Sequence, residues 1–250
     1  MPDEERTSPP EKEHSTGITR HGSAPFARAS SGGLLTSLRG SFSSQYLTLT
    51  SIIQGVALAY LVVVVDEEMN EFHVAQWLFV VTAFLAIVSA WHEYMTAVTV
   101  FVWVPRLWDA VIPFLVGGSE LMLIRSLRRP GGLEWSFLAL GVVAAVTLLA
   151  FLNMYRSAAA EEDLNRDLLA RTAFYKELNL AFVSFAAVLL CSFAAVEAAA
   201  NGSARLDVVL SAIALGLVLV FVIRGYFYWN RIIHIAREGA AAEPRVEEAG

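Results

Sequence analysis

Apolar residues along this chain fall into long uninterrupted runs rather than short alternating stretches. The first run, "YLTLTSIIQGVALAYLVVVV" at residues 46–65, is 20 residues long and carries no charge. About 20 residues cross the hydrocarbon core of a bilayer. The next apolar region, from Gln76 to Ile124, corresponds to about 73 Å of helix, which fits two spans and is too long for one. We predict a turn at Pro105, because proline disfavours helical geometry in the residue before it.

The whole pattern predicts an all-α polytopic membrane protein, a bundle of six transmembrane helices. The expected spans are about 46–65, 76–103, 107–124, 135–154, 178–200 and 207–228. In lipid every backbone polar group must be bonded within its own segment, so spans of this kind are helical.

The spans define three regions of the chain. Residues 1–44 are rich in Ser, Pro, Gly and charge and predict a disordered N-terminal tail. They contain no apolar segment typical of a cleaved signal peptide. Residues 45–230 form the transmembrane domain and 231–250 a C-terminal tail. The connection 155–177 has helical composition, which indicates a surface helix or an extension of a span and leaves a partner-docking site as an alternative.

Composition supports the membrane class and excludes several others. Of the 250 residues 56% are hydrophobic and 17% are charged, against about 45–50% and about 25% in soluble domains. The lone Cys191 excludes a disulfide framework and a cysteine-based metal site. No basic patch with interleaved aromatic residues indicates a nucleic-acid partner. We expect no cofactor.

Positive charge predicts the orientation. With the N-terminus inside, 14 of the 18 Lys and Arg residues lie on the inner side, as the positive-inside rule requires. We therefore expect both termini in the cytoplasm, in a bacterial inner (plasma) membrane. The outer loop "RSLRRP" is the main exception. The acidic stretch "DEEMNEFH" at 66–73 indicates either a solvated outer loop or a mouth that concentrates cations.

A histidine and a carboxylate, His92 and Glu93, interrupt the second apolar region. The zinc-protease pattern needs a second histidine four residues after the first, and Thr96 stands there. We expect no metal site, and no nucleophile and base set indicates an enzyme.

The depth of Glu93 depends on the turn. With the turn at Pro105, Glu93 and Glu120 lie about 18 Å and about 22 Å up their helices, close to one level near the middle of the bilayer. With a turn near 93–95, His92 and Glu93 lie at the surface. Buried ionisable residues in a membrane indicate function. Pro113 and Gly117-Gly118 predict a kink or break beside Glu120, which is typical of transporter binding sites.

Further polar residues complete the set of candidates. Ser44, Thr48, Ser51 and Gln54-Gly55 share one face of the first span and indicate either close helix packing or cavity lining. Arg106 and Asp109 are spaced for a local ion pair at the inner interface. Near the end of the last span, Tyr226, Tyr228 and Trp229 predict an interfacial aromatic belt. The positive-inside anchors expected beside it are Arg224, Arg231 and Arg237. The candidates for lining a pathway or binding an ion are His92, Glu93, Glu120, Gln54, Ser51 and Asp109.

The six-span plan is similar to that of the bacterial relatives of the lysosomal potassium channel. The stretch "RGSFSSQ" at 39–45 resembles their Arg…Phe-Ser-Asp signature, with a spacing one residue shorter and with Ser44 in place of the aspartate. We assign no family on this resemblance and transfer no functional residue from it.

The sequence favours a channel or transporter for a small cation, a proton or a small solute, with polar groups on the first three spans. The alternative is a non-transporting accessory, sensor or scaffold protein that acts through its cytoplasmic tail and the 155–177 connection. The lipid bilayer is the expected partner, and assembly into a homo-oligomer stays open.

Overall fold

The computed structural model describes residues 31–129, 133–200 and 203–242. Within these ranges the chain forms six helices and no strand. The helices are α1 (Ser31–Glu68), α2 (Val74–Val100), α3 (Leu107–Ser126), α4 (Glu134–Ala160), α5 (Glu162–Ala200) and α6 (Ala204–Ala242). Each is long and apolar enough to cross a membrane, so the prediction of an all-α membrane protein with six long apolar helices is confirmed.

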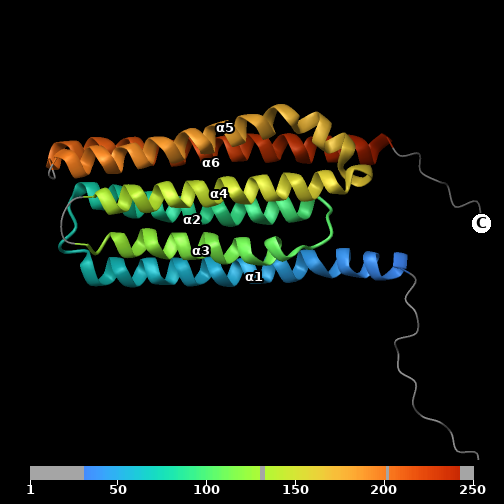
Figure 1. Cartoon of the computed structure of the whole chain (residues 1–250), viewed down its shortest axis with the longest axis horizontal. Helices are drawn as coiled ribbons and strands as arrows, with labels where there is room; N and C mark the ends of the chain where they lie inside the picture. Colours follow the sequence, from blue (N-terminus) through green and yellow to red (C-terminus); the bar gives the residue numbers. More distant parts are fainter. Residues whose placement is uncertain (1–30, 130–132, 201–202, 243–250) are drawn as a thin grey trace, which may run out of the picture.

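The helices run alternately along one axis and close into a ring. Successive helices point in opposite directions, so α1 begins and α6 ends at the same end of the bundle (Figure 1). We call this end, which also holds the α2–α3 connection, the Pro105 end, and the opposite one the Glu68 end. In space α1 packs on α2 and α3, α6 packs on α2 and α5, and α4 packs on α3 and α5. The order around the ring is therefore α1, α2, α6, α5, α4 and α3, with α2 also touching α3 and α4 across it.

The half of the ring interior toward the Glu68 end is filled by a packed apolar core. Phe137 of α4 makes edge-to-face contacts with Phe79 of α2 and Phe193 of α5, at centroid distances of 4.8 and 5.7 Å. Aliphatic side chains such as Ile87 and Leu123 are fully buried around these rings. This core closes the interior on that side.

The chain turns between α2 and α3 at Pro105. Residues 101–106 have no regular structure, and the backbone at Phe101 is extended (φ −95°, ψ 142°). This confirms the predicted turn, and the alternative turn near 93–95 is wrong. Helix α2 ends at Val100, three residues before the predicted boundary at 103. The reason is that β-branched and aromatic residues alternate in "VTVFVWVP" and favour extended backbone.

A buried asparagine of α5 holds this connection in place. Asn165 Oδ1 accepts a hydrogen bond from the Val102 backbone N–H at 3.1 Å, and Asn165 Nδ2 donates to the Val102 carbonyl at 2.7 Å. The same amide donates to the carbonyl of Ala158 at 2.9 Å. One side chain therefore joins the α2–α3 connection to the α4–α5 connection and satisfies backbone groups that the turn leaves without helical partners.

Three helices are about twice as long as the hydrocarbon core of a bilayer is thick. Helices α1, α5 and α6 have 38, 39 and 39 residues, about 57–59 Å against about 30 Å of hydrocarbon. Helices α1 and α6 extend past the other helices at the Pro105 end, and the α5–α6 pair extends past them at the Glu68 end (Figure 1). The 155–177 connection is thus helical, as expected. Two expected boundaries change, because α1 starts at Ser31 rather than near 45 and α6 continues to Ala242 rather than ending near 230. The predictions for residues 1–30 and 243–250 lie outside the described residues.

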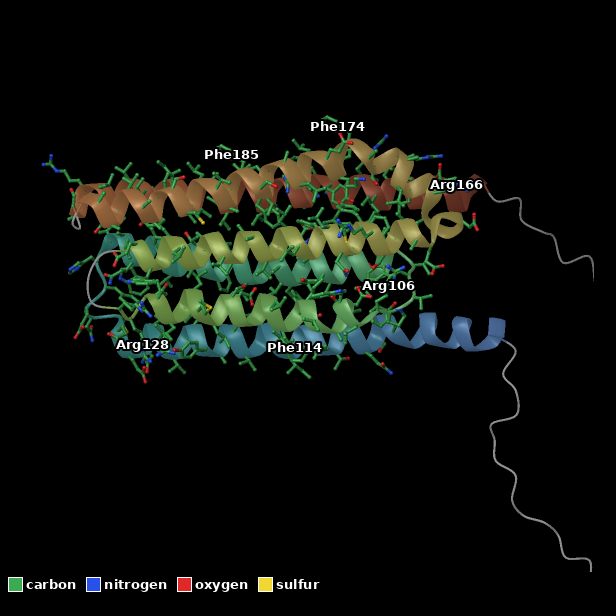
Figure 2. The ribbon with its side chains drawn as sticks, viewed as in Figure 1. Arg106, Phe114, Arg128, Arg166, Phe174 and Phe185 are labelled. Carbon is green, nitrogen blue, oxygen red and sulfur yellow. The ribbon has the colours of Figure 1, made fainter. Side chains whose placement is uncertain are left out.

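The outer surface of the bundle is apolar along its length and charged at its ends. Phe174 and Phe185 point away from the bundle on α5, and Phe114 does so on α3 (Figure 2). Arg106 and Arg166 lie at the Pro105 end (Figure 2). A broad apolar surface of this kind is what a lipid environment requires.

At the Glu68 end the basic stretch "RSLRRP", the exception to the positive-inside rule, contacts the acidic stretch at 66–73. Arg128 forms an ion pair with Glu67 and lies 3.4 Å from Glu68, on the last turn of α1. Arg129 stacks over the ring of Trp135 at 4.4 Å. The bases of "RSLRRP" therefore bind acidic and aromatic neighbours at the same end, which ties α1 to the end of α3.

Candidate functional site

Glu93 is buried between α2 and α6. Trp229 Nε1 donates a hydrogen bond to Glu93 Oε2 at 3.1 Å, and the residues are 8% and 3% exposed. Gly225 lies one turn before Trp229 on α6, and a Cβ there would collide with Glu93 Oε1. The two positions, spaced i and i+4, share one face of the helix. Gly225 therefore supplies the space and Trp229 the donor for one buried carboxylate.

Arg224 is the cation nearest to this carboxylate on α6. It interacts electrostatically with Glu93. Its guanidinium stacks on the rings of Phe182 and Phe221, at 4.8 and 5.4 Å. Among the described residues, its Nε and Nη1 are buried and have no hydrogen-bond partner. Arg224 is thus inside the bundle, not at the boundary that the anchor prediction gave it.

The predicted aromatic belt is also only partly at the surface. Tyr226 is 62% exposed, whereas Tyr228 and Trp229 are 1% and 3% exposed. The Tyr228 and Tyr155 hydroxyls lie 3.2 Å apart. The belt interpretation is wrong for Tyr228 and Trp229, because they share the inward face of α6 with Gly225 and Ile232, while Tyr226 points outward.

Asp109 lies at the start of α3, facing α4. Its Oδ2 accepts a hydrogen bond from the backbone N–H of Arg106 at 2.7 Å, and its Oδ1 accepts one from Asn153 Nδ2 at 2.7 Å. Asp109 is 2% exposed. The predicted contact between Arg106 and Asp109 exists, but it uses the backbone of Arg106, since a carboxylate at the third helical position caps the helix start. The side chain of Asn153 completes the carboxylate's shell.

Glu120 is fully buried on α3 but faces α1 rather than Glu93. Gln54 of α1 lies beside it, yet neither Glu120 carboxylate oxygen has a hydrogen-bond partner among the described residues. Glu93 lies seven residues before the end of α2 and Glu120 lies thirteen after the start of α3, about 10 and about 20 Å from the turn. The expectation of one shared level is wrong, because α2 ends earlier than predicted and α3 packs mainly on α1 and α4.

One of the two glycines before Glu120 permits close packing of α3 against α1. Helix α3 is continuous from Leu107 to Ser126, through Pro113 and both glycines, so the predicted break does not occur. A Cβ on Gly117 would collide with Ile53 of α1, whereas a Cβ on Gly118 would meet nothing within 4 Å. Gly117 thus lets α1 approach α3.

Two sequence candidates lie on the outside of the bundle. His92 is exposed, about 100° around α2 from the buried Glu93. Ser51 is exposed on α1, together with Ser44 and Thr48, and its Oγ accepts a hydrogen bond from Trp91 Nε1 at 3.2 Å. Gln54 is the buried member of that set, at 3% exposure. The structure therefore brings Glu93 and Asp109 toward the interior and leaves His92 and Ser51 outside it.

A cavity of about 100 Å³ occupies the interior of the ring in its Pro105 half. Residues from all six helices line it. Most of its polar residues gather near the Pro105 end, namely Glu93, Asp109, Asn153, Tyr46, Tyr94 and Trp103, and Thr147 adds one hydroxyl at the middle of α4. Toward the middle of the bundle the lining becomes aliphatic, with Leu140, Val143 and Leu217. The cavity is thus amphipathic along the axis of the bundle.

A second cavity of about 120 Å³ lies beside the first, between the start of α1 and the α2–α3 connection. Phe42, Thr99 and Val102 line it. It shares Val98 and Trp103 with the central cavity. Trp103 therefore stands between the two spaces.

Another buried carboxylate, Glu197 of α5, lies outside both cavities. It is 1% exposed, faces Asp207 across the α5–α6 hairpin and lies three residues before the Glu68 end of its helix. Within residues 31–129, 133–200 and 203–242, no group of three or more His, Cys, Asp and Glu side chains is placed to hold a metal ion.

Sequence reasoning missed the partners of Glu93 and Asp109, namely Trp229, Gly225, Arg224 and Asn153. One signal was available, since "RGYFYW" places Gly225 and Trp229 four residues apart on one helix face. Comparison with protein families, with curated proteins and with solved structures finds no match for this chain.

Proposed function

We propose that this integral membrane protein is a transporter that moves a proton or a small cation through the interior of the helix ring. The observation that carries the proposal is the central cavity, lined by residues of all six helices, with Glu93 and Asp109 at its polar end. Carboxylates buried in a membrane interior are costly and commonly mark ion pathways and proton relays. The proposed pathway differs from the sequence hypothesis, since it runs among all six helices rather than along the first three.

The packed core toward the Glu68 end favours a transporter over an open pore. The central cavity adjoins the second cavity near the Pro105 end. Toward the Glu68 end the aromatic core around Phe137 fills the interior. A site reached from one face and sealed from the other is the arrangement that alternating access uses. In this proposal Trp103 lies on the route by which the cation enters.

The proposed orientation and location follow the distribution of positive charge. With 14 of 18 Lys and Arg residues on the side of the termini, the Pro105 end faces the cytoplasm of a bacterial inner membrane. The cavity then takes its substrate from, or releases it to, the cytoplasm. We propose no catalytic activity.

The proposal is tested by flux into liposomes that contain the purified full-length chain. Proton flux is followed with an enclosed pH-sensitive dye under an imposed membrane potential, and cation flux with labelled ions. We expect Glu93→Gln to lower the flux at least about tenfold. The amide oxygen of glutamine still accepts the hydrogen bond of Trp229, so the fold is kept and only the charge is lost.

Glu197→Gln is the matched control. It makes the same change at a buried carboxylate that lies outside both cavities, and it should retain the flux. Equal flux in wild-type and Glu93→Gln liposomes, or no flux above that of protein-free liposomes, would contradict the proposal.

A second candidate function is that of a non-transporting accessory or scaffold protein. The parts of α1, α5 and α6 that extend past the bilayer at the Pro105 end favour it, since they offer helical surface such as the 71%-exposed Phe174. This alternative predicts that the purified protein gives no flux. It also predicts that one stoichiometric partner cross-links to residues 155–177.

A further inference from the structure

The polar end of the central cavity has one carboxylate oxygen available for a ligand. Asp109 uses both of its oxygens, on the Arg106 backbone and on Asn153. Glu93 uses Oε2 on Trp229, and the described residues give Oε1 no hydrogen bond. Beside Oε1 stands Gly225, which has no side chain. Glu93 Oε1 is therefore the acceptor on which a donor entering the cavity can bind.

Two acidic side chains lie at this end. Glu93 and Asp109 line the cavity. Arg224 interacts electrostatically with Glu93 and stacks on the rings of Phe182 and Phe221, which line the cavity, but Arg224 itself is not part of the lining. Two carboxylates against one guanidinium favour a ligand with one positive charge.

Aromatic side chains surround the same end. Tyr46, Tyr94 and Trp103 line it, with the Tyr46 and Tyr94 rings 6.1 Å apart. Aromatic faces attract cations, and organic ammonium groups above all, because these are weakly hydrated and give up their water at low cost. A negative carboxylate next to tyrosine and tryptophan rings thus favours an ammonium group over an inorganic ion.

The other end of the cavity selects for a hydrocarbon chain. Leu140, Val143 and Leu217 offer no oxygen that could replace the hydration shell of sodium or potassium. Each methylene placed there gains about 0.8 kcal/mol of hydrophobic free energy. The ligand should therefore be amphipathic, with its charge toward Pro105 and its apolar part toward the core.

The volume sets the size of the ligand. The cavity holds about 100 Å³, less than the roughly 150 Å³ that accommodates benzene in an engineered protein cavity. It is also well below the roughly 300–1,000 Å³ of sites for drug-sized molecules. The ligand should therefore be an ammonium ion with a short alkyl chain, and n-butylammonium, which is about as large as benzene, marks the upper limit of size.

We propose that the central cavity binds a small alkylammonium ion, with its ammonium group on Glu93 Oε1 among the tyrosine rings and its alkyl chain against the aliphatic wall. This inference rests on the proposed function, since it names the substrate class of the same cavity.

The test is equilibrium binding of radiolabelled n-butylammonium to the full-length protein in nanodiscs. We expect one saturable site per chain. Unlabelled n-butylammonium should compete for it, whereas 1-butanol of the same shape, potassium ions and the larger benzyltrimethylammonium should not. No saturable binding, or equal competition by 1-butanol or potassium, would overturn the inference.

Substitutions at the two ends of the cavity locate the site. Glu93→Gln should weaken binding roughly tenfold to a hundredfold, the loss expected for one charge-assisted hydrogen bond. Glu197→Gln should leave binding unchanged. Ala144 lines the cavity, and Ala144→Leu fills it. The neighbouring Ala145 is exposed on α4 and does not line the cavity, so Ala145→Leu is the control for an added leucine. Unchanged affinity in both Glu93→Gln and Ala144→Leu would contradict this placement.

The two assays distinguish a failure of the binding proposal from a failure of the transport proposal. Glu93-dependent flux of protons or inorganic cations without n-butylammonium binding would refute the substrate class and leave the transporter standing. Binding with the predicted selectivity but without flux of any cation would refute the transporter and leave the site standing.

Discussion

Adding one methyl group at Gly225 should displace the Glu93 carboxylate. A Cβ at Gly225 collides with Glu93 Oε1, and α6 packs along α2 at this point. The carboxylate must move, or the helices must separate. Either change stretches or breaks the 3.1 Å hydrogen bond from Trp229.

The expected cost exceeds the intrinsic preference of a helix for alanine. Alanine stabilises a helix interior by about 1 kcal/mol relative to glycine. Overpacking a buried contact costs about 1–3 kcal/mol, and leaving the indole N–H without a partner costs about 1–3 kcal/mol more. We therefore expect Gly225→Ala to destabilise the protein by about 1–5 kcal/mol.

The assay is reversible unfolding in mixed micelles, followed by tryptophan fluorescence, with Gly216→Ala as the matched control. Gly216 is on the same helix, and a Cβ there meets nothing within 4 Å, so this variant should be about 1 kcal/mol more stable than wild type. In a Glu93→Ala background, Gly225→Ala should no longer destabilise the protein, because the carboxylate with which the added Cβ collides is absent. A Gly225→Ala protein as stable as Gly216→Ala, or the same cost in both backgrounds, would refute the packing described here.

Two further contacts predict measurable effects. Gly117→Ala should destabilise the protein by about 1–3 kcal/mol, because the added Cβ collides with Ile53. In the same unfolding assay Gly118→Ala should be neutral or stabilising, since a Cβ there meets nothing within 4 Å. Equal free energies of unfolding for the two variants would contradict the close approach of α1 and α3. Asn165→Leu removes the hydrogen bonds to Val102 and should speed hydrogen exchange of the Val102 amide at least about tenfold; unchanged exchange there would show that this asparagine does not hold the connection.

Hydropathy was enough to predict the six helices, because each span is a long apolar run. The turn at Pro105 was also predicted, since the backbone preference of proline is local. The end of α2 was misplaced by three residues, because the apolar stretch "VTVFVWV" continues a hydropathy pattern while its β-branched residues end the helix.

The arrangement around the site could not be read from the sequence. Apolar runs do not say which helices are neighbours, so Glu93 was expected to face Glu120 on the next helix in sequence. The ring places α6 beside α2 instead, with Trp229 as the donor. Tyr228 and Trp229 were misplaced for the same reason, since an interfacial belt and a buried face have the same composition near a helix end.

The central claim, that the ring encloses a cavity reached from the Pro105 end, is tested most directly by labelling a cysteine at position 147. Thr147 lines the cavity, and Cys191→Ala first removes the single native cysteine. We predict that a charged, membrane-impermeant thiol reagent labels Thr147→Cys from the side on which it labels Leu107→Cys, the 80%-exposed position at the Pro105 end, and far more slowly from the other side. A Thr147→Cys protein as unreactive from both sides as Ala145→Cys, which faces the lipid, would contradict it.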